Sequence, residues 1–184
     1  MSGITEKLSE PLTIDQVDFR IQSINRGGYA TILAYKDARV DMHRLNSVLG
    51  VGAWQKHFEE IAGNLFCSVG IYTENGWAWV QDVGIESNTE KEKGRASDAF
   101  KRACFNLGIG IELYDYPEIT VKLNDGEWEM RAGRDGKERP SATWNLKLKD
   151  WSWYSEFTDR KISFLAAKDG NGKMRFQWGK RHGK

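Results

Sequence analysis

Three short β-like segments follow one another in the middle of the chain, and tight turns separate them. The segments cover residues 53–61, 65–72 and 77–83, and the turns are Gly63-Asn64 and Glu74-Asn75-Gly76. Turns this short join only antiparallel neighbours, because a parallel pair needs a crossover of a dozen or more residues. The sequence therefore predicts an antiparallel β-β-β meander.

The helical pattern that follows the meander is the clearest one in the chain. It covers residues 89–107, with Thr89 as its expected cap and Gly108 as its stop. Its apolar positions recur with helical spacing: Ala96, Ala99, Phe100, Ala103 and Leu107. Most of these side chains are small, so the helix can lie close against the sheet. The predicted fold class is α+β, with the meander packed on one long helix.

The remaining segments complete a provisional domain plan. The spacing of apolar residues predicts an N-terminal helix from Thr13 to the glycines at 27–28, a strand at 29–35 and a helix at 37–49. The plan has four parts: a flexible N-terminus (1–12), a core domain (13–119), a linker or loop (120–143) and a basic, aromatic C-terminal segment (144–184).

Charge is distributed unevenly along the chain. The formal net charge is only +1, but residues 1–119 hold 12 basic against 17 acidic residues, and residues 140–184 hold ten against four. The C-terminal segment is therefore a candidate for phosphate or other acidic partners. A mildly basic, solvated tail is the alternative.

Several kinds of chemistry lack their residues in this sequence. Gly172-Lys173 is followed by Met174, so it does not match a phosphate-binding loop. Cys67 and Cys104 lie far apart in apolar stretches, and we interpret both as small buried residues in a reducing compartment. We expect no cofactor, no metal, no catalytic activity, no membrane segment and a cytoplasmic protein. The best remaining carboxylate pair for a metal-dependent nuclease is Asp82 with Glu86.

Three features together favour nucleic acid. The 89–107 helix carries cations away from its apolar stripe: Lys91, Lys93, Arg95, Lys101 and Arg102. The meander is rich in aromatic residues, which on an exposed sheet can stack on unpaired bases. The C-terminal segment interleaves aromatic residues with Lys and Arg, as sequence-tolerant single-strand binders do. For each feature separately, a solvated helix face or an aromatic core is the alternative.

The same segments resemble a known family. Asp82-Val83-Gly84 followed by EKEKGRASDAFKRACFNLGIG at 90–110 is similar to the signature of the Rad-fifty-two/Sak-type single-strand annealing proteins. Upstream, AYKDARVDMHRLNSVLGVGAW at 34–54 resembles the same family's helix and the turn that follows it. The resemblance covers about residues 15–115, and the short chain is closer to the phage or prophage branch.

The resemblance implies ATP-independent annealing of complementary strands in recombination and repair, by an annealing-protein core assembled into rings of about eleven subunits. The family's groove cations map onto Arg39, Lys101 and Arg102, with Lys93 as a further one. A third groove cation is replaced by Phe105, and the hairpin at Glu74-Asn75 lacks the family's outer-site lysine. We expect Lys56 or the C-terminal segment to compensate. The candidate contacts are Arg39, Lys56, Lys93, Arg95, Lys101 and Arg102.

The expected partners are single-stranded DNA, further copies of the chain, and a single-strand-binding protein or a recombinase. Two alternatives stay open beside annealing. One is a module that coats single-stranded DNA and recruits a recombinase without annealing. The other is the metal-dependent nuclease.

Overall fold

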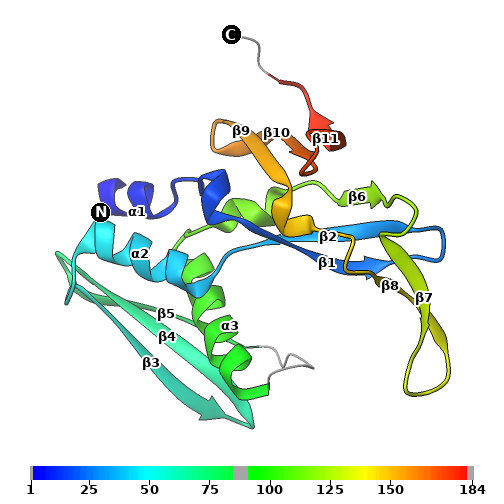
Figure 1. Ribbon diagram of the computed structural model, residues 1–184. Helices are drawn as coiled ribbons and strands as arrows, with labels where there is room; N and C mark the ends of the chain where they lie inside the picture. Colours follow the sequence, from blue (N-terminus) through cyan, green and yellow to red (C-terminus); the bar gives the residue numbers. More distant parts are fainter. Residues whose placement is uncertain (1, 85–90, 182–184) are drawn as a thin grey trace. The chain divides into compact units, whose positions relative to one another are not determined.

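The computed structural model describes residues 2–84 and 91–181, and the side chains of all of these except 2 and 91–93. The chain divides into two compact units (Figure 1). Unit 1 comprises residues 1–12 and 36–112, and unit 2 comprises residues 13–35 and 113–184. Both units combine antiparallel sheets with few helices or short helical turns, which confirms the predicted α+β class.

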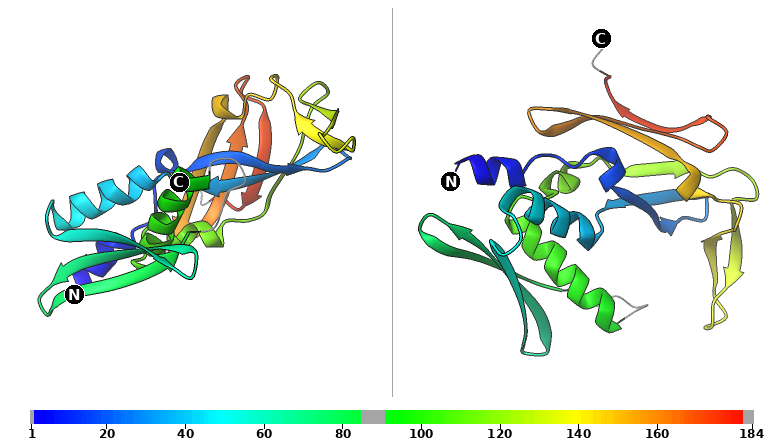
Figure 2. Two further views of the ribbon diagram at one scale, coloured as in Figure 1. Left: turned by 90° about the horizontal axis from the view of Figure 1, so that it is seen from below. Right: turned by 60° about the vertical axis from the view of Figure 1, so that its left-hand side comes forward.

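Among its described residues, unit 1 contains one sheet and three α-helices. The strands β3 (Trp54–Ile61), β4 (Asn64–Thr73) and β5 (Gly76–Val83) form an antiparallel sheet in that order. The helices are α1 (Ser2–Leu8), α2 (Ala38–Leu49) and α3 (Lys91–Asn106). Figure 2 shows α3 lying along one face of the sheet.

The core of unit 1 lies between that face and the helices. Cys67 and Val69 of β4 pack with Phe100 and Ala103 of α3 and with Leu45 of α2. Alternation along each strand sends every second side chain to this face. The close approach of α3 depends on Gly84, where a Cβ would lie 2.3 Å from the Arg95 carbonyl oxygen.

Unit 2 is built mainly from strands. One sheet has the order β1-β2-β6, formed by β1 (Asp18–Ile24), β2 (Tyr29–Tyr35) and β6 (Ile119–Lys122). A second has the order β11-β10-β9, formed by β9 (Ser152–Thr158), β10 (Lys161–Lys168) and β11 (Met174–Gly179). Strands β7 (Trp128–Ala132) and β8 (Glu138–Ala142) pair as a hairpin.

Short 3-10 helices connect some of these elements: η1 (Ile14–Gln16), η2 (Ile111–Asp115) and η3 (Leu148–Asp150). The core of unit 2 includes Ile32 and Ile119 of the first sheet with Leu165 and Ala167 of the second. Trp151 packs against the same cluster.

Three segments differ from the sequence-based predictions. Residues 1–12, predicted to be flexible, contain α1, and Leu8 and Leu12 are buried. The helix predicted from Thr13 is wrong: one 3-10 turn is followed by β1, whose Phe19 and Ile21 alternate toward the core of unit 2. An apolar spacing that also suits a helix is overridden here by pairing with β2 across a tight turn.

Residues 120–143, predicted as a linker or loop, form most of β6 and the β7–β8 hairpin. Gly and charge dominate this segment because both hairpin strands are largely exposed, so their side chains need not be apolar. The two-unit division also differs from the predicted boundaries of 13–119 and 144–184, since residues 13–35 belong with the C-terminal part.

Candidate nucleic-acid interface

Two of the predicted cations are Arg39, at the beginning of α2, and Lys101, in the middle of α3. Asp37 caps α2 by accepting a hydrogen bond from the Arg39 backbone N–H, and it also accepts one from Arg39 Nε at 2.8 Å. These bonds lower the pKa of Asp37, and the charge of Lys101 lowers it further. Lys101 therefore lies within electrostatic reach of the α2 N-terminus. Nothing in the described part of the chain forms an ion pair with Lys101.

Arg39 forms an exposed ion pair with Asp37. Its side chain is 77% exposed, as is 42% of the Asp37 side chain. Exposed ion pairs of this kind contribute about 0–1 kcal/mol. A phosphate group that competed for this one ion pair would therefore displace little stabilising energy.

Arg102 has a structural contact as well as its predicted role. Its Nε lies 3.3 Å from the Asp82 carboxylate on β5, and Asn106 also donates a hydrogen bond to Asp82. These contacts attach α3 to β5. No bond from the two Nη groups of Arg102 is found among the described residues, so they remain able to donate to a phosphate.

The other three predicted cations lie elsewhere on unit 1 or are not described. Lys56 of β3 is exposed, with its Nζ 4.5 Å from the centre of the Phe100 ring. Arg95 donates to the Gly63 carbonyl in the β3–β4 turn, so it holds α3 to the sheet. The side chain of Lys93 lies outside the described residues.

A buried cation, Lys36, is missing from the sequence-based set. It is 1% exposed, donates hydrogen bonds to Asp41 and to the Ile109 carbonyl, and lies 4.0 Å from the centre of the Phe105 ring. Burial lowers the pKa of Lys36 and raises the pKa of Asp41 to about 6, while each partner's charge opposes the other's shift. Phe105 thus belongs to a structural cluster beneath the surface. The burial of Lys36 could not be predicted, because nothing in the sequence marks a lysine between a strand and a helix as buried.

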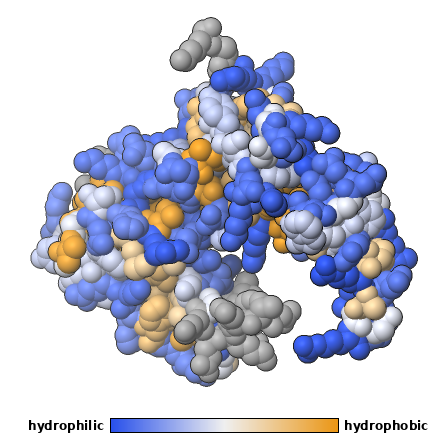
Figure 3. Space-filling model, viewed as in Figure 1, coloured by the Kyte–Doolittle hydropathy of each residue, from blue (hydrophilic) through white to orange (hydrophobic). Residues whose placement is uncertain are grey.

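The aromatic residues of the sheet divide between its two faces. Trp54 and Phe58 pack against the core, and Trp54 Nε1 donates to Asn46 at 2.7 Å. Tyr72, Trp77 and Trp79 lie on the opposite face and are 57%, 38% and 50% exposed. Trp79 lies over Gly70, and the three rings contact one another in sequence. We call these three residues the outer aromatic face. The side of the molecule drawn in Figure 3 is mostly hydrophilic, with smaller hydrophobic areas.

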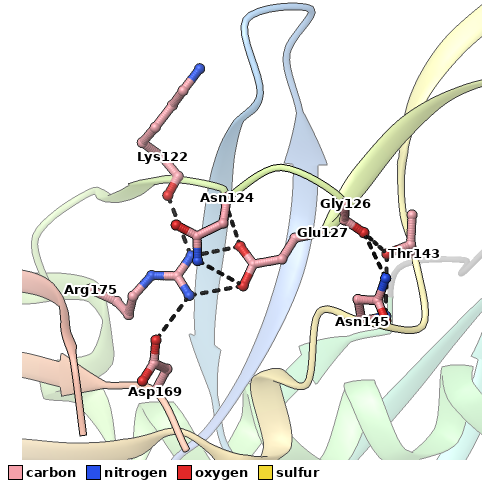
Figure 4. A network of polar contacts seen from close by, with 8 residues as sticks. All are labelled: Lys122, Asn124, Gly126, Glu127, Thr143, Asn145, Asp169 and Arg175. Carbon is pink, nitrogen blue, oxygen red and sulfur yellow. Dashed lines mark hydrogen bonds and ion pairs between the residues drawn. The ribbon is translucent and has the colours of Figure 1, made fainter. Parts of the chain in front are cut away.

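In the C-terminal segment, Arg175 is a structural residue of unit 2. Its side chain is 3% exposed and forms ion pairs with Glu127 at 2.7 Å and Asp169 at 3.4 Å (Figure 4). It also lies over the Trp151 ring. Arg175 is therefore unavailable to phosphate, although its place among aromatic residues suggested otherwise.

Other residues with candidate chemistry lie as follows in the described part of the chain. Asp82 is held by Arg102 and Asn106, while Glu86 lies outside the described residues. Within residues 2–84 and 91–181, no group of three His, Cys, Asp or Glu side chains could hold a metal ion. Cys67 and Cys104 are buried as predicted, and burial raises the pKa of the Cys67 thiol to about 11. No described helix is long and apolar enough to cross a membrane.

Comparison with known proteins finds two relatives. No family model matches the chain. The chain is 32% identical to the single-stranded DNA-binding protein DdrA of Deinococcus deserti over 133 residues. This matched stretch covers 70% of this chain and 65% of the relative. The chain is 30% identical over 129 residues to the protein of the same name from Deinococcus radiodurans, covering 68% of this chain and 61% of the relative. The chain spans somewhat less than two thirds of each of these proteins, and it is similar to both.

Proposed function

We propose that the protein binds single-stranded DNA and anneals complementary strands without ATP, as an oligomeric ring, in recombination and repair. The observation that carries the proposal is that Arg39, exposed at the beginning of α2, and Lys101 of α3 both act on the capping residue Asp37. The Nη groups of Arg102, the next residue of α3, form no bond among the described residues. The two DdrA relatives, named for single-stranded DNA binding, support the choice of ligand.

This surface suits a phosphate backbone. Cations on two helices can contact neighbouring phosphates, and Ser97, one turn before Lys101, is a small exposed residue that leaves room for a strand. Contacts made to phosphates do not read sequence. They also leave base edges free, which annealing requires.

Annealing proceeds without a chemical step, so we propose no catalytic residue. One shallow site of two or three cations binds weakly, but a ring repeats it and raises the affinity for a long strand through multivalency. The Rad-fifty-two/Sak-type resemblance supports the ring, and an annealing core formed by β3–β5 with α3 is proposed on the same basis. The phage or prophage branch remains a prediction.

The coating or mediator module is the alternative, because it would use the same phosphate contacts. It differs in one measurable respect: such a module binds a single strand but does not accelerate its pairing with a complement.

Binding is tested by fluorescence anisotropy of a labelled single-stranded oligonucleotide at increasing salt concentration. We expect Lys101→Ala to reduce the slope of log affinity against log salt by about one, the value for one lost phosphate contact. Arg39→Ala should do the same.

Lys7→Ala is the matched control, since Lys7 is an exposed cation of unit 1 on α1. It should leave both affinity and slope unchanged. Equal slopes for the wild type and Lys101→Ala would refute the assignment of the site, and no binding by the wild type would refute the function.

A further inference from the structure

The sheet of β9, β10 and β11 has one face in the core of unit 2 and one face that forms a groove. Trp153, Ala167 and Phe176 share a register position on the core face. The opposite face carries Tyr154 next to Ala166 and Gln177, and Ser152 next to Lys168. A groove of about 520 Å³ is lined mainly by this face, with Phe164, Met174 and Arg181, and also by Trp153.

The groove combines cations with aromatic and apolar surface. Lys168 and Arg181 supply positive charge, while Tyr154 and Met174 are about 45% exposed. Along β10, Lys168 is four residues from Phe164, which corresponds to ~14 Å at 3.4 Å a residue. Ala166 between these positions is small, and so is Ser152 beside Lys168, so a flat ring could approach the sheet.

Some of these side chains are already held in place. The Tyr154 hydroxyl donates to Glu156 at 2.8 Å, and the Arg181 guanidinium lies 5.1 Å from the centre of the Tyr154 ring. Tyr154 also contacts Phe164 edge to face, with ring centres 6.1 Å apart. Ordered aromatic and guanidinium planes reduce the entropy lost when a ligand binds.

The charge of this groove distinguishes it from its neighbours. Its lining, as far as the structure describes it, includes no acidic residue. Three other grooves of unit 2 each include at least one: Asp15 and Asp18 in the first, Glu127, Asp150 and Asp169 in the second, and Glu118 in the third. Residues 140–184 as a whole have a net charge of +6. Arg181 forms an ion pair at 3.4 Å with Glu156, which lies outside this lining, and the Arg181 side chain is still 69% exposed. Of these four grooves, this one is therefore the best suited to an anionic ligand.

We infer that the groove on β9–β11 is a second contact site for single-stranded DNA, separate from the Arg39–Lys101 site. Unpaired bases stack on Tyr154 and on the Arg181 plane, and Lys168 contacts the phosphate backbone. An aromatic platform with flanking cations requires bases whose faces are exposed, which a duplex does not offer. The inference rests on the proposed function for the identity of the ligand.

The test compares variants of the full chain for binding of a labelled oligothymidine. Lys168→Gln/Arg181→Gln removes both groove cations and keeps side-chain length. Arg134→Gln/Lys137→Gln removes the same charge from the exposed turn of the β7–β8 hairpin. We expect the groove pair to lower the salt slope by about one to two and the hairpin pair to leave it unchanged.

Tyr154→Leu tests stacking separately from charge. It should weaken binding by about fivefold or more, which corresponds to the lower limit for one base stacked on an aromatic ring. The far-ultraviolet circular dichroism of each variant shows whether it has folded. If Tyr154→Leu unfolds the chain, the Lys168→Gln/Arg181→Gln variant alone tests whether the groove binds DNA.

The outcomes separate this inference from the proposed function. If the Lys168→Gln/Arg181→Gln variant binds DNA as well as the Arg134→Gln/Lys137→Gln variant, the second site is overturned. If Lys101→Ala still loses salt-dependent binding in that case, the Arg39–Lys101 site stands. A groove that binds polyglutamate more tightly than oligothymidine overturns the DNA assignment in favour of an acidic peptide. No binding of DNA by the wild type overturns the proposed function itself.

Discussion

A lysine in a protein interior needs partners that replace water, and Lys36 has them in Asp41 and the Ile109 carbonyl. The pair links the segment before α2, α2 itself and the turn after α3. One oxygen of Asp41 has no partner among the described residues, so the site is only partly satisfied. Burying two charged side chains costs desolvation energy, but removing one of them costs more, because the other charge is then buried without a partner.

Lys36→Met should therefore lower the free energy of unfolding by about 3–5 kcal/mol, because it leaves the Asp41 carboxylate buried and unpaired. Chemical denaturation measures the loss. The double variant Lys36→Met/Asp41→Leu should regain most of it. A single variant as stable as the wild type would contradict this account of the pair.

Acid stability depends on another buried pair, Arg175 with Glu127. Burial alone would raise the pKa of Glu127. The hydrogen bonds and charge of Arg175, together with the Asn124 N–H, lower the pKa by more than burial raises it, so the net shift is downward. A carboxyl with a lowered folded-state pKa contributes stability that is fully present above its unfolded-state pKa, about 4.3. That stability is lost as pH falls through the folded-state pKa.

We therefore expect the melting temperature of the wild type to fall between about pH 5 and pH 3, and Arg175→Met to flatten this dependence. Arg131→Met is the control, since its ion pair with Glu129 is exposed. If the two variants show the same pH dependence, Arg175 is not its source.

At the scale of elements, the sequence predicted those whose signals are local. The strand at 29–35 begins and ends as predicted, and the strands of the meander are placed within two residues at each end. Their turns contain Gly and Asn, which define strand ends in the sequence itself. The helix predicted at 13–26 failed because β1 owes its form to pairing with β2, a contact that apolar spacing cannot reveal.

The packing of α3 on its sheet gives a test at the same scale. Gly84→Ala should lower the free energy of unfolding by about 1–3 kcal/mol, since the new methyl group would overlap the Arg95 carbonyl and force α3 away. Gly3→Ala in α1 is the control, since nothing beyond its chain neighbours and the backbone of its own helix lies within 4 Å of the added carbon. It should be neutral or stabilising by up to ~1 kcal/mol. Thermal unfolding that ranks Gly84→Ala as the more stable variant would contradict the tight contact.

At the scale of the whole molecule, oligomer formation needs a contact surface, and the outer aromatic face offers one. Exposed clusters of large aromatic residues are typical of protein–protein contacts. We expect Trp79→Ser to shift the protein toward smaller species in analytical ultracentrifugation. Trp144→Ser, at a residue 80% exposed on unit 2, should leave the distribution unchanged. Unaltered assembly of Trp79→Ser would exclude this face as the contact.

The candidate site could be predicted in part. The resemblance selected Arg39, Lys101 and Arg102, and the structure shows what composition could not: Arg102 shares its guanidinium with Asp82, Arg95 holds a turn and Arg175 is buried. Whether a given cation forms an ion pair with an acidic residue depends on how helices and strands pack against one another. Sequence spacing therefore identifies the helix that carries the charge but not which charges remain available.

The central claim is annealing through the α2–α3 cations, and one measurement tests it most directly. Two complementary labelled oligonucleotides are mixed with the wild type or with Lys101→Ala/Arg102→Ala, without nucleotide or metal, at increasing salt. We expect the wild type to accelerate pairing and the double variant, once shown to be folded, to lose most of that acceleration. Equal acceleration by both proteins, or binding by the wild type without any acceleration, would contradict the claim.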